Sequence, residues 1–376
     1  MFSRKVIAAT LLSLGLGVSA TAANATTYPL KLENCGYPLT FDKAPARVVT
    51  VGQAGTEILY SLGLADKVVG TSVWFNPVLP QFKAVNAKIP RLDDNAPSFE
   101  SVVDKKPNLV VTQFEWHIGK EGVVGTREQF HDLKIPTYSL LSDCEGKNNT
   151  QGSDGTRTDA YNINTLYKSI DQLATIFNVE AKGKELVSGL KAREAAAVEK
   201  VKKAGVKNLS AVVWMSSADM ESDPWLAGQK GVAGYMLNQL GIKNVVTSSE
   251  EWPTVGWETV AKANPSMIII ARMDRRRFPA DDHEKKIEFL KNDAVTKHMD
   301  AVKNNRFAIV DADALQASHR RRHGVDCRHR GQDEGPQALS CVFRNATLRG
   351  LNGAHRAMQD GAPPPGLPVL PAAHVS

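Results

Sequence analysis

The chain has 376 residues, of which 42% are hydrophobic and 23% are charged, an ordinary composition for a globular protein. This length is sufficient for two domains with cores of their own. The pI of about 9.0 comes from the two ends, because residues 26–318 hold 36 basic and 36 acidic side chains. The neutral body removes the charge argument for nucleic acid or an anionic membrane as a partner, and we expect neither nucleic-acid binding nor membrane insertion.

Residues 1–25 have the pattern of a cleavable secretory signal. Arg4 and Lys5 precede an apolar stretch, and Ala23-Asn24-Ala25 is a small-residue cleavage site. The apolar stretch is shorter than the ~20 residues needed to cross a bilayer. Because no cysteine lies at the cleavage site, a lipid anchor is disfavoured. We therefore expect an exported, soluble protein that begins near Thr26.

Four cysteines remain in the exported chain. Cys35 and Cys144 both lie in the well-patterned first half, and we expect them to form a disulfide, as is common in exported proteins. A zinc site is less favoured, because neither has a second Cys or His at ligand spacing. Cys327 and Cys341 lie near the end and could form a bridge of their own.

Short apolar segments alternate with helical patterns along the chain. This alternation is typical of parallel sheets covered on both faces, and it predicts an α/β fold. The predicted strands lie at residues 46–51, 67–72, 108–113 and 135–140 in the first half, and at 209–216, 244–249, 266–271 and 307–312 in the second.

The two halves repeat one order of parts. FESVVDKKPNLVV (residues 99–111) matches WETVAKANPSMII (257–269), with a Glu followed seven residues later by Pro in both segments. ILYSLGLADKVV and MLNQLGIKNVV form a second matching pair. A repeat of this length that occurs twice indicates two lobes of similar, Rossmann-like fold.

A helical segment joins the two halves. Residues 181–204 are rich in strong helix formers and contain no Pro, which predicts one long, stiff helix between the lobes. The alternative is that this helix belongs to one lobe alone. The expected organisation is a signal at 1–25, a lobe at 26–158, a helical segment at 159–205, a second lobe at 206–318 and an atypical tail at 319–376.

Several segments in this order resemble a known family. The region from Tyr28 to Ser72, TEILYSLGL within it, the two Glu segments and KNNRFAIVDAD are together similar to the substrate-binding proteins of ABC importers for iron–siderophore complexes and vitamin B12. The resemblance extends from about Tyr28 to about Asp313. It implies two α/β lobes joined by one backbone helix, a ligand between the lobes, a periplasmic location and delivery to an ABC permease.

The resemblance also implies a role for the repeated glutamates. In the family, one exposed Glu on each lobe docks on arginines of the permease, and the matching positions are Glu100 and Glu258. Such pairs are directional and charge-assisted, which suits a two-point anchor. The alternative for each Glu alone is stabilisation of a helix N-terminus.

Aromatic and polar side chains follow the predicted strands. In open α/β sheets, ligands bind beyond the carboxyl ends of the strands, and aromatic walls with few polar groups suit a small-molecule site. Arginines after a buried strand could pair with the oxygens of an anionic chelate. A core or solvated position is the alternative for each. The candidate ligand-binding residues are Gln53, Trp74, Phe114, Trp116, Trp214, Trp225, Trp252, Arg272 and Arg275.

The resemblance implies a ferric siderophore as the ligand, and the residues favour other functions less. The chain has no GxSxG, HExxH, GxGxxG or P-loop motif, so we expect no enzyme activity. A heme carrier would need a Tyr or His ligand in the cleft, and Tyr138, Tyr235 and His117 keep that function open; cobalamin is a further alternative. We expect no resident cofactor or metal, because the iron would arrive inside the chelate, and we expect a monomer.

The sequence changes character after Ser318. Five of the nine histidines lie in this tail, and APPPGLPVLPAA has the composition of a linker. One hypothesis is an out-of-frame extension that replaces the terminal helix expected from the resemblance. The alternative is a genuine basic or metal-binding tail.

Overall fold

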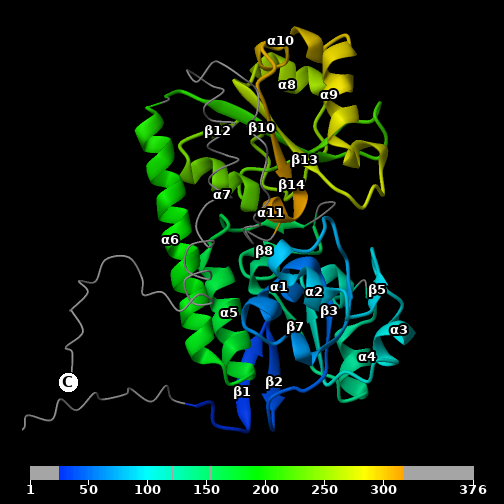
Figure 1. Cartoon of the computed structure of the whole chain (residues 1–376). Coiled ribbons are helices and arrows are strands. Elements are labelled where there is room, and N and C mark those ends of the chain that lie inside the picture. The colour runs from blue at the N-terminus through cyan, green and yellow to red at the C-terminus, as the bar shows by residue number, and fades with distance from the viewer. Residues whose placement is uncertain (1–24, 121, 152–154, 206, 317–376) are drawn as a thin grey trace, which may run out of the picture.

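The computed structural model describes residues 25–120, 122–151, 155–205 and 207–316, which form two lobes beside one long helix (Figure 1). The predicted signal, up to Asn24, and the predicted tail, together with Cys327 and Cys341, lie outside these described residues.

The first lobe contains a five-stranded parallel sheet with the strand order β5-β4-β3-β6-β7. Its strands are β3 (Val48–Val51), β4 (Val68–Ser72), β5 (Arg91–Asp93), β6 (Leu109–Thr112) and β7 (Thr137–Ser139). The connecting helices are α1 (Gln53–Ser61), α2 (Lys83–Asn86), α3 (Phe99–Val103) and α4 (Arg127–Asp132). The predicted strands of the first half are confirmed.

The second lobe repeats this order. Its sheet runs β11-β10-β13-β14, β12 also pairs with β10, and only β11 is antiparallel. β12, β10, β13 and β14 thus correspond to β4, β3, β6 and β7. The strands are β10 (Ser210–Ser216), β11 (Trp225–Leu226), β12 (Lys243–Asn244), β13 (Met267–Arg272) and β14 (Phe307–Asp311). The helices are α7 (Val232–Gln239), α8 (Trp257–Ala263), α9 (His283–Asn292), α10 (Asp300–Lys303) and α11 (Ala312–Gln316).

One strand prediction was too long. Of residues 244–249, only Asn244 belongs to a strand, because after Val245 donates to Ala211 O the chain turns away from β10. Short 3₁₀ turns complete the connections of both lobes, at Ala65–Lys67, Pro80–Phe82, Glu115–His117, Leu141–Asp143, Pro279–Asp281 and Thr296–His298.

The internal repeat has a physical basis at the helix ends. α1 and α7 are each followed by a glycine with a left-handed backbone, Gly63 (φ 75°) and Gly241 (φ 67°). A left-handed residue allows the chain to leave a helix and turn back toward the sheet, and glycine adopts it without a Cβ clash. The same termination thus leads each lobe into its next strand, β4 and β12.

The long helix α6 (Glu180–Ala204) follows α5 (Asn164–Ile176) and confirms the predicted bridge. Its 25 residues span about 37 Å at 1.5 Å per residue. Val187 and Leu190 pack in the core of the first lobe, whereas Val201 packs in a cluster with Leu209 and Leu237 of the second lobe. α6 therefore contacts both lobes and runs along one side of the molecule (Figure 1). No helix among the described residues is long and apolar enough to cross a membrane.

A second connection between the lobes lies near the disulfide. The short hairpin of β8 (Lys147–Asn148) and β9 (Thr156–Arg157) reaches the second lobe, where Arg157 and Glu251 form a buried ion pair at 2.6 Å. Arg157 N also donates to Ser249 O. Because Glu251 precedes Trp252, this contact supports the loop that carries that tryptophan.

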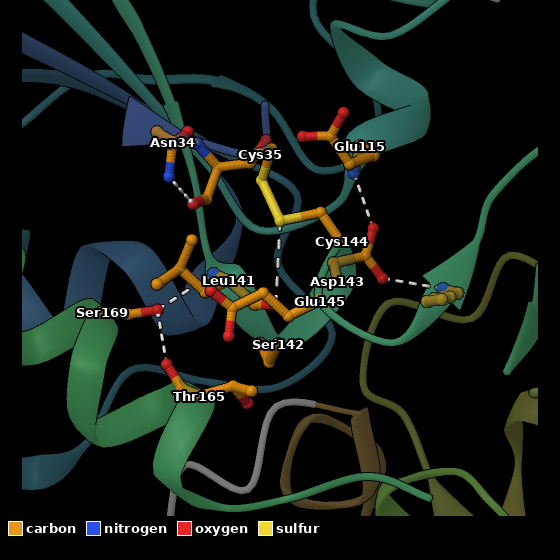
Figure 2. Close-up of a disulfide and its surroundings, with 12 residues drawn as sticks. Asn34, Cys35, Glu115, Leu141, Ser142, Asp143, Cys144, Glu145, Thr165 and Ser169 are labelled. Carbon is orange, nitrogen blue, oxygen red and sulfur yellow. Dashed lines mark hydrogen bonds and ion pairs between the residues drawn. A yellow bond between two sulfur atoms is a disulfide. The ribbon is translucent and has the colours of Figure 1, made fainter. Parts of the chain in front are cut away.

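The predicted disulfide is confirmed. Cys35, between β1 (Leu30–Asn34) and β2 (Tyr37–Phe41), is bonded to Cys144 across 109 residues of sequence (Figure 2). Next to it, Asp143 accepts from Glu115 N and pairs with Lys147. The bond therefore ties the N-terminal hairpin to the start of the β8–β9 segment.

We predict that the double variant Cys35→Ser/Cys144→Ser loses about 2–4 kcal/mol of unfolding free energy, because the bond closes a loop of more than a hundred residues in the unfolded chain. Urea unfolding followed by far-UV circular dichroism measures the loss. The variant should show no further decrease when a reductant is added, unlike the wild type. Equal unfolding midpoints for the two oxidised proteins would contradict the prediction.

Candidate functional site

A pocket of about 310 Å³ lies where the two lobes meet, beyond the carboxyl ends of β10 and β13. Phe75, which follows β4, comes from the first lobe, and the remaining lining comes from the second. The lining residues are Phe75, Met215, Ser216, Trp225, Trp252, Met273, Arg275, Arg277, Phe278, Asp281 and Gln316. This is the strand edge at which open α/β sheets bind ligands.

Three predicted ligand residues line this pocket: Trp225, Trp252 and Arg275. Trp225 lies on β11, and its ring meets Phe278 edge-on, with the centroids 5.1 Å apart. Trp252 is largely buried and packs in a cluster that contains Phe75 and Met273. The pocket thus has aromatic side chains on several sides, as small-molecule sites commonly have.

Arg275 provides an available positive charge in the pocket. Its guanidinium lies over the Phe75 ring, 4.5 Å from the centroid, and burial lowers the pKa of Arg275. The buried Nε has no hydrogen-bond partner among the described residues. An arginine that is partly desolvated and lacks a partner on one donor favours an oxygen-rich anionic ligand.

The acidic side chain that lines the pocket, Asp281, already accepts hydrogen bonds from protein groups. Asp281 accepts from Ser216 Oγ at 2.6 Å and from Phe278 N at 3.0 Å. Its carboxylate therefore holds the pocket wall together. Arg275 and Arg277 are left to give the lining a positive balance.

A buried lysine supports the strand ends that border the pocket. Lys286 of α9 donates to the backbone oxygens of Met215 and, at 2.8 Å, Ala271. Burial lowers the pKa of Lys286 to about 7. Because β10 and β13 contribute these acceptors, Lys286 joins the two strand ends, a role that the sequence patterns did not indicate.

Trp74 and Trp214 do not line the pocket, contrary to our expectation. Trp74 is 2% exposed, and its Nε1 donates to Thr71 Oγ1, while Trp214 is fully buried against Trp257. Successive strand side chains point to opposite faces. On β10, Trp214 therefore faces the α8–α9 side, and its neighbour Met215 faces the pocket.

Four further candidates lie near the pocket without lining it. Gln53 is fully buried behind Phe75, and Phe114 contacts the Phe75 ring edge-on at 6.3 Å. Trp116 is 39% exposed beside His117. Arg272 donates from Nε to Asp311 at 2.7 Å, so its charge is paired within the second lobe.

The candidate heme ligands do not reach the pocket in this structure. Tyr138 is fully buried and donates to Gln172, and Tyr235 donates to Glu194 of α6. His117 is 1% exposed, and neither ring nitrogen has a hydrogen-bond partner among the described residues. Among all the residues that the structure describes, no group of three or more His, Cys, Asp or Glu side chains is arranged to hold a metal ion.

The sequence-based candidates include three of the eleven residues that line the pocket. Some of the other lining residues stand next to a candidate at the end of a predicted strand. The rest lie in short turns, and the course of such turns depends on tertiary packing. Phe75 follows Trp74, and Met273 follows Arg272. The sequence therefore indicated the correct strand end, but it did not indicate which of the two adjacent side chains faces the pocket. The lining residues outside the candidate list are Phe75, Met215, Ser216, Met273, Arg277, Phe278, Asp281 and Gln316.

Glu100 and Glu258 occupy matching positions in the two lobes. Each is the second residue of its helix, α3 or α8, and each side chain is exposed. A non-glycine residue with positive φ follows each helix, Lys106 three residues after the end of α3 and Asn264 directly after α8, and each stands just before a buried proline. The repeat therefore extends to backbone conformation, and no ion pair holds either Glu among the described residues.

The sequence matches the periplasmic binding protein family over residues 48–314. It is 26% identical over 292 residues to the uncharacterized ABC transporter substrate-binding lipoprotein YvrC of Bacillus subtilis (strain 168), covering 77% of this chain and 81% of the relative.

Solved structures share the fold. An ABC-type Fe3+-hydroxamate transport system protein from Saccharomonospora viridis has 22% identity and a TM-score of 0.62, covering 85% of this chain and 98% of that one. A periplasmic heme binding protein from Pseudomonas aeruginosa has 17% identity and a TM-score of 0.56, covering 72% and 86%. The family match over most of the described residues, with two lobes and one bridging helix, shows that the chain belongs to the periplasmic binding protein family.

Proposed function

We propose that this protein captures a ferric siderophore in the periplasm and delivers it to the permease of an ABC importer. The observation that carries the proposal is Arg275, a partly buried cation that lines an aromatic pocket between the lobes and whose buried Nε has no hydrogen-bond partner among the described residues. Iron(III) chelates present oxygen-rich, often anionic surfaces, which charge-assisted donors recognise. The similar ABC-type Fe3+-hydroxamate protein supports an iron chelate as the cargo.

The proposed activity is binding without chemical conversion. The iron is cargo and arrives with its own ligands, so the protein needs no resident metal or cofactor. Release would take place at the permease, with Glu100 and Glu258 as the docking points. Export would use the N-terminal signal. The relative from Bacillus subtilis is named a lipoprotein, whereas Cys35, the first cysteine of this chain, is engaged in the disulfide.

Heme is the second candidate ligand, because the similar protein from Pseudomonas aeruginosa binds heme by its name. His117 is the one predicted axial ligand that combines burial with two unpartnered ring nitrogens. Its burial places it behind Phe114 and Trp116, with ring centroids 5.9 and 4.5 Å away. Heme ligation would therefore require this aromatic group to move, which favours the ferric siderophore.

We predict that Arg275→Met weakens binding of ferric siderophores 10- to 100-fold, the cost of losing a hydrogen bond from a charged group. Quenching of Trp225 and Trp252 during titration with ferric siderophores, hemin and cobalamin measures the affinity. Arg47→Met is the matched control, because Arg47 is exposed and its side chain bonds only the backbone oxygens of Lys105 and Lys106 among the described residues. Quenching by cobalamin alone would refute an iron cargo.

We predict that Glu100→Lys/Glu258→Lys leaves ligand affinity within two-fold of wild type and abolishes uptake by cells, because both docking pairs become repulsive. Glu128→Lys/Glu284→Lys is the matched control, since these exposed glutamates are also the second residues of helices, α4 and α9. Loss of uptake in the control pair, or loss of ligand affinity in the docking pair, would argue against docking.

We predict that folding stability falls as the pH drops from 6.5 toward 4, in part because of His117. Burial lowers the pKa of His117 to about 4, so the unfolded chain binds the proton first. The full loss of unfolding free energy from this histidine is about 3 kcal/mol at 1.36 kcal/mol per pH unit.

His117→Phe should remove this part of the decrease, as measured by urea unfolding at several pH values. Titration with hemin should show no Soret change in either protein. His298→Phe, which alters an exposed histidine, should keep the wild-type slope. A hemin Soret band that His117→Phe removes would instead establish His117 as a heme ligand.

A further inference from the structure

The two lobes are joined by direct backbone hydrogen bonds at one side of the pocket. Asp274 N and Arg275 N of the second lobe both donate to Phe75 O of the first, at 2.9 and 3.2 Å. Asn76 Nδ2 donates to Arg272 O at 3.3 Å. We call the two segments, Phe75–Asn76 and residues 272–275, the inter-lobe latch.

A single buried side chain holds the first-lobe half of this latch. Gln53 Oε1 accepts from Phe75 N at 3.1 Å and from Asn76 N at 3.2 Å, and its Nε2 donates to Asn76 O at 3.0 Å. Gln53 N also donates to Val73 O. Gln53 is fully buried at the start of α1, so the turn after β4 is fixed to the body of the first lobe.

The latch forms one wall of the ligand pocket. Phe75, Met273 and Arg275 all line the pocket, and the Arg275 guanidinium lies over the Phe75 ring. With the latch closed, the volume is about 310 Å³. This volume is at the lower end of the roughly 300–1,000 Å³ range of small-molecule sites. Opening of the bonds to Phe75 O would separate the two segments of this wall and widen the pocket.

We propose that Gln53 is a positioning residue that keeps the inter-lobe latch closed, and that the closed latch restricts the pocket to compact iron chelates. The restriction on size rests on the proposed function, whereas the role of Gln53 in the latch does not. The residue expected from sequence to touch the ligand thus acts on the ligand through Phe75 and Arg275.

Hydrogen exchange measures the latch without any ligand. Gln53→Met keeps the volume and removes all four hydrogen bonds of the side chain, three to the turn and one to Glu57 Oε1. The amides of Asp274 and Arg275 should then exchange at least ten-fold faster, as followed by mass spectrometry of peptides covering residues 272–276. Asn34→Leu is the matched control, because Asn34 is another fully buried amide that both accepts from and donates to backbone, at Ser139, far from the latch.

A second variant tests the latch independently, in case Gln53→Met does not fold. Asn76→Ala removes the bonds of Asn76 Nδ2 to Arg272 O and Asp311 Oδ1 and leaves the Gln53 contacts with the backbone of the turn in place. It should also accelerate exchange at residues 274 and 275, by a smaller factor. Unchanged exchange there in the folded variants, or equal acceleration in Asn34→Leu, would overturn the role of Gln53.

Ligand size is tested with two anionic iron compounds, an iron(III)–catechol complex and the bulkier hemin. Wild type should bind the catechol complex more tightly, and Gln53→Met should reduce that preference at least ten-fold, while Asn34→Leu keeps it. A wild-type preference for hemin, or an unchanged preference in Gln53→Met, would overturn the size limit. Binding of neither compound would overturn the proposed function together with the size limit, and the exchange result would still decide the role of Gln53.

Discussion

The structure depends on parallel strands that are buried on both faces. β3 pairs with β4 and β6, and β10 pairs with β12 and β13, so the central strand of each lobe has a parallel neighbour on each side. Parallel pairing requires a crossover between strands, and the crossover helices cover the faces. It also brings the carboxyl ends of β10 and β13 to one edge, where the pocket forms. The sequence contains an internal repeat because both lobes must satisfy this same constraint.

The lobes are held together by contacts of three kinds. α6 contributes to the core of both lobes, the Arg157–Glu251 pair is buried behind the pocket, and the latch joins them beside the pocket. A buried ion pair adds little net stability but is costly to break, because a lone charge would remain. These contacts hold the two lobes together at several points around the pocket.

The charges at the pocket follow a simple division. Asp281 and Lys286 are satisfied by protein groups and hold the strand ends and turns in place. Arg272 is paired with Asp311. Arg275 retains a donor without a partner among the described residues, so the arginine available for an anion is the one that lies three positions beyond the strand end.

The sequence by itself determined the α/β fold, the bridging helix, the disulfide and the matching positions of Glu100 and Glu258, because these depend on periodicity, helix propensity and repetition along the chain. It also indicated the strand edge at which the pocket lies. Only the tertiary structure decided which side chain at that edge faces the pocket. Trp214 and Met215 are adjacent on one strand, yet one is core and the other is pocket, because strand side chains alternate. The role of Gln53 depends on the turn at Phe75 and Asn76 that it holds. That turn bonds to the second lobe, and no local sequence pattern predicts a contact between residues so far apart in the chain.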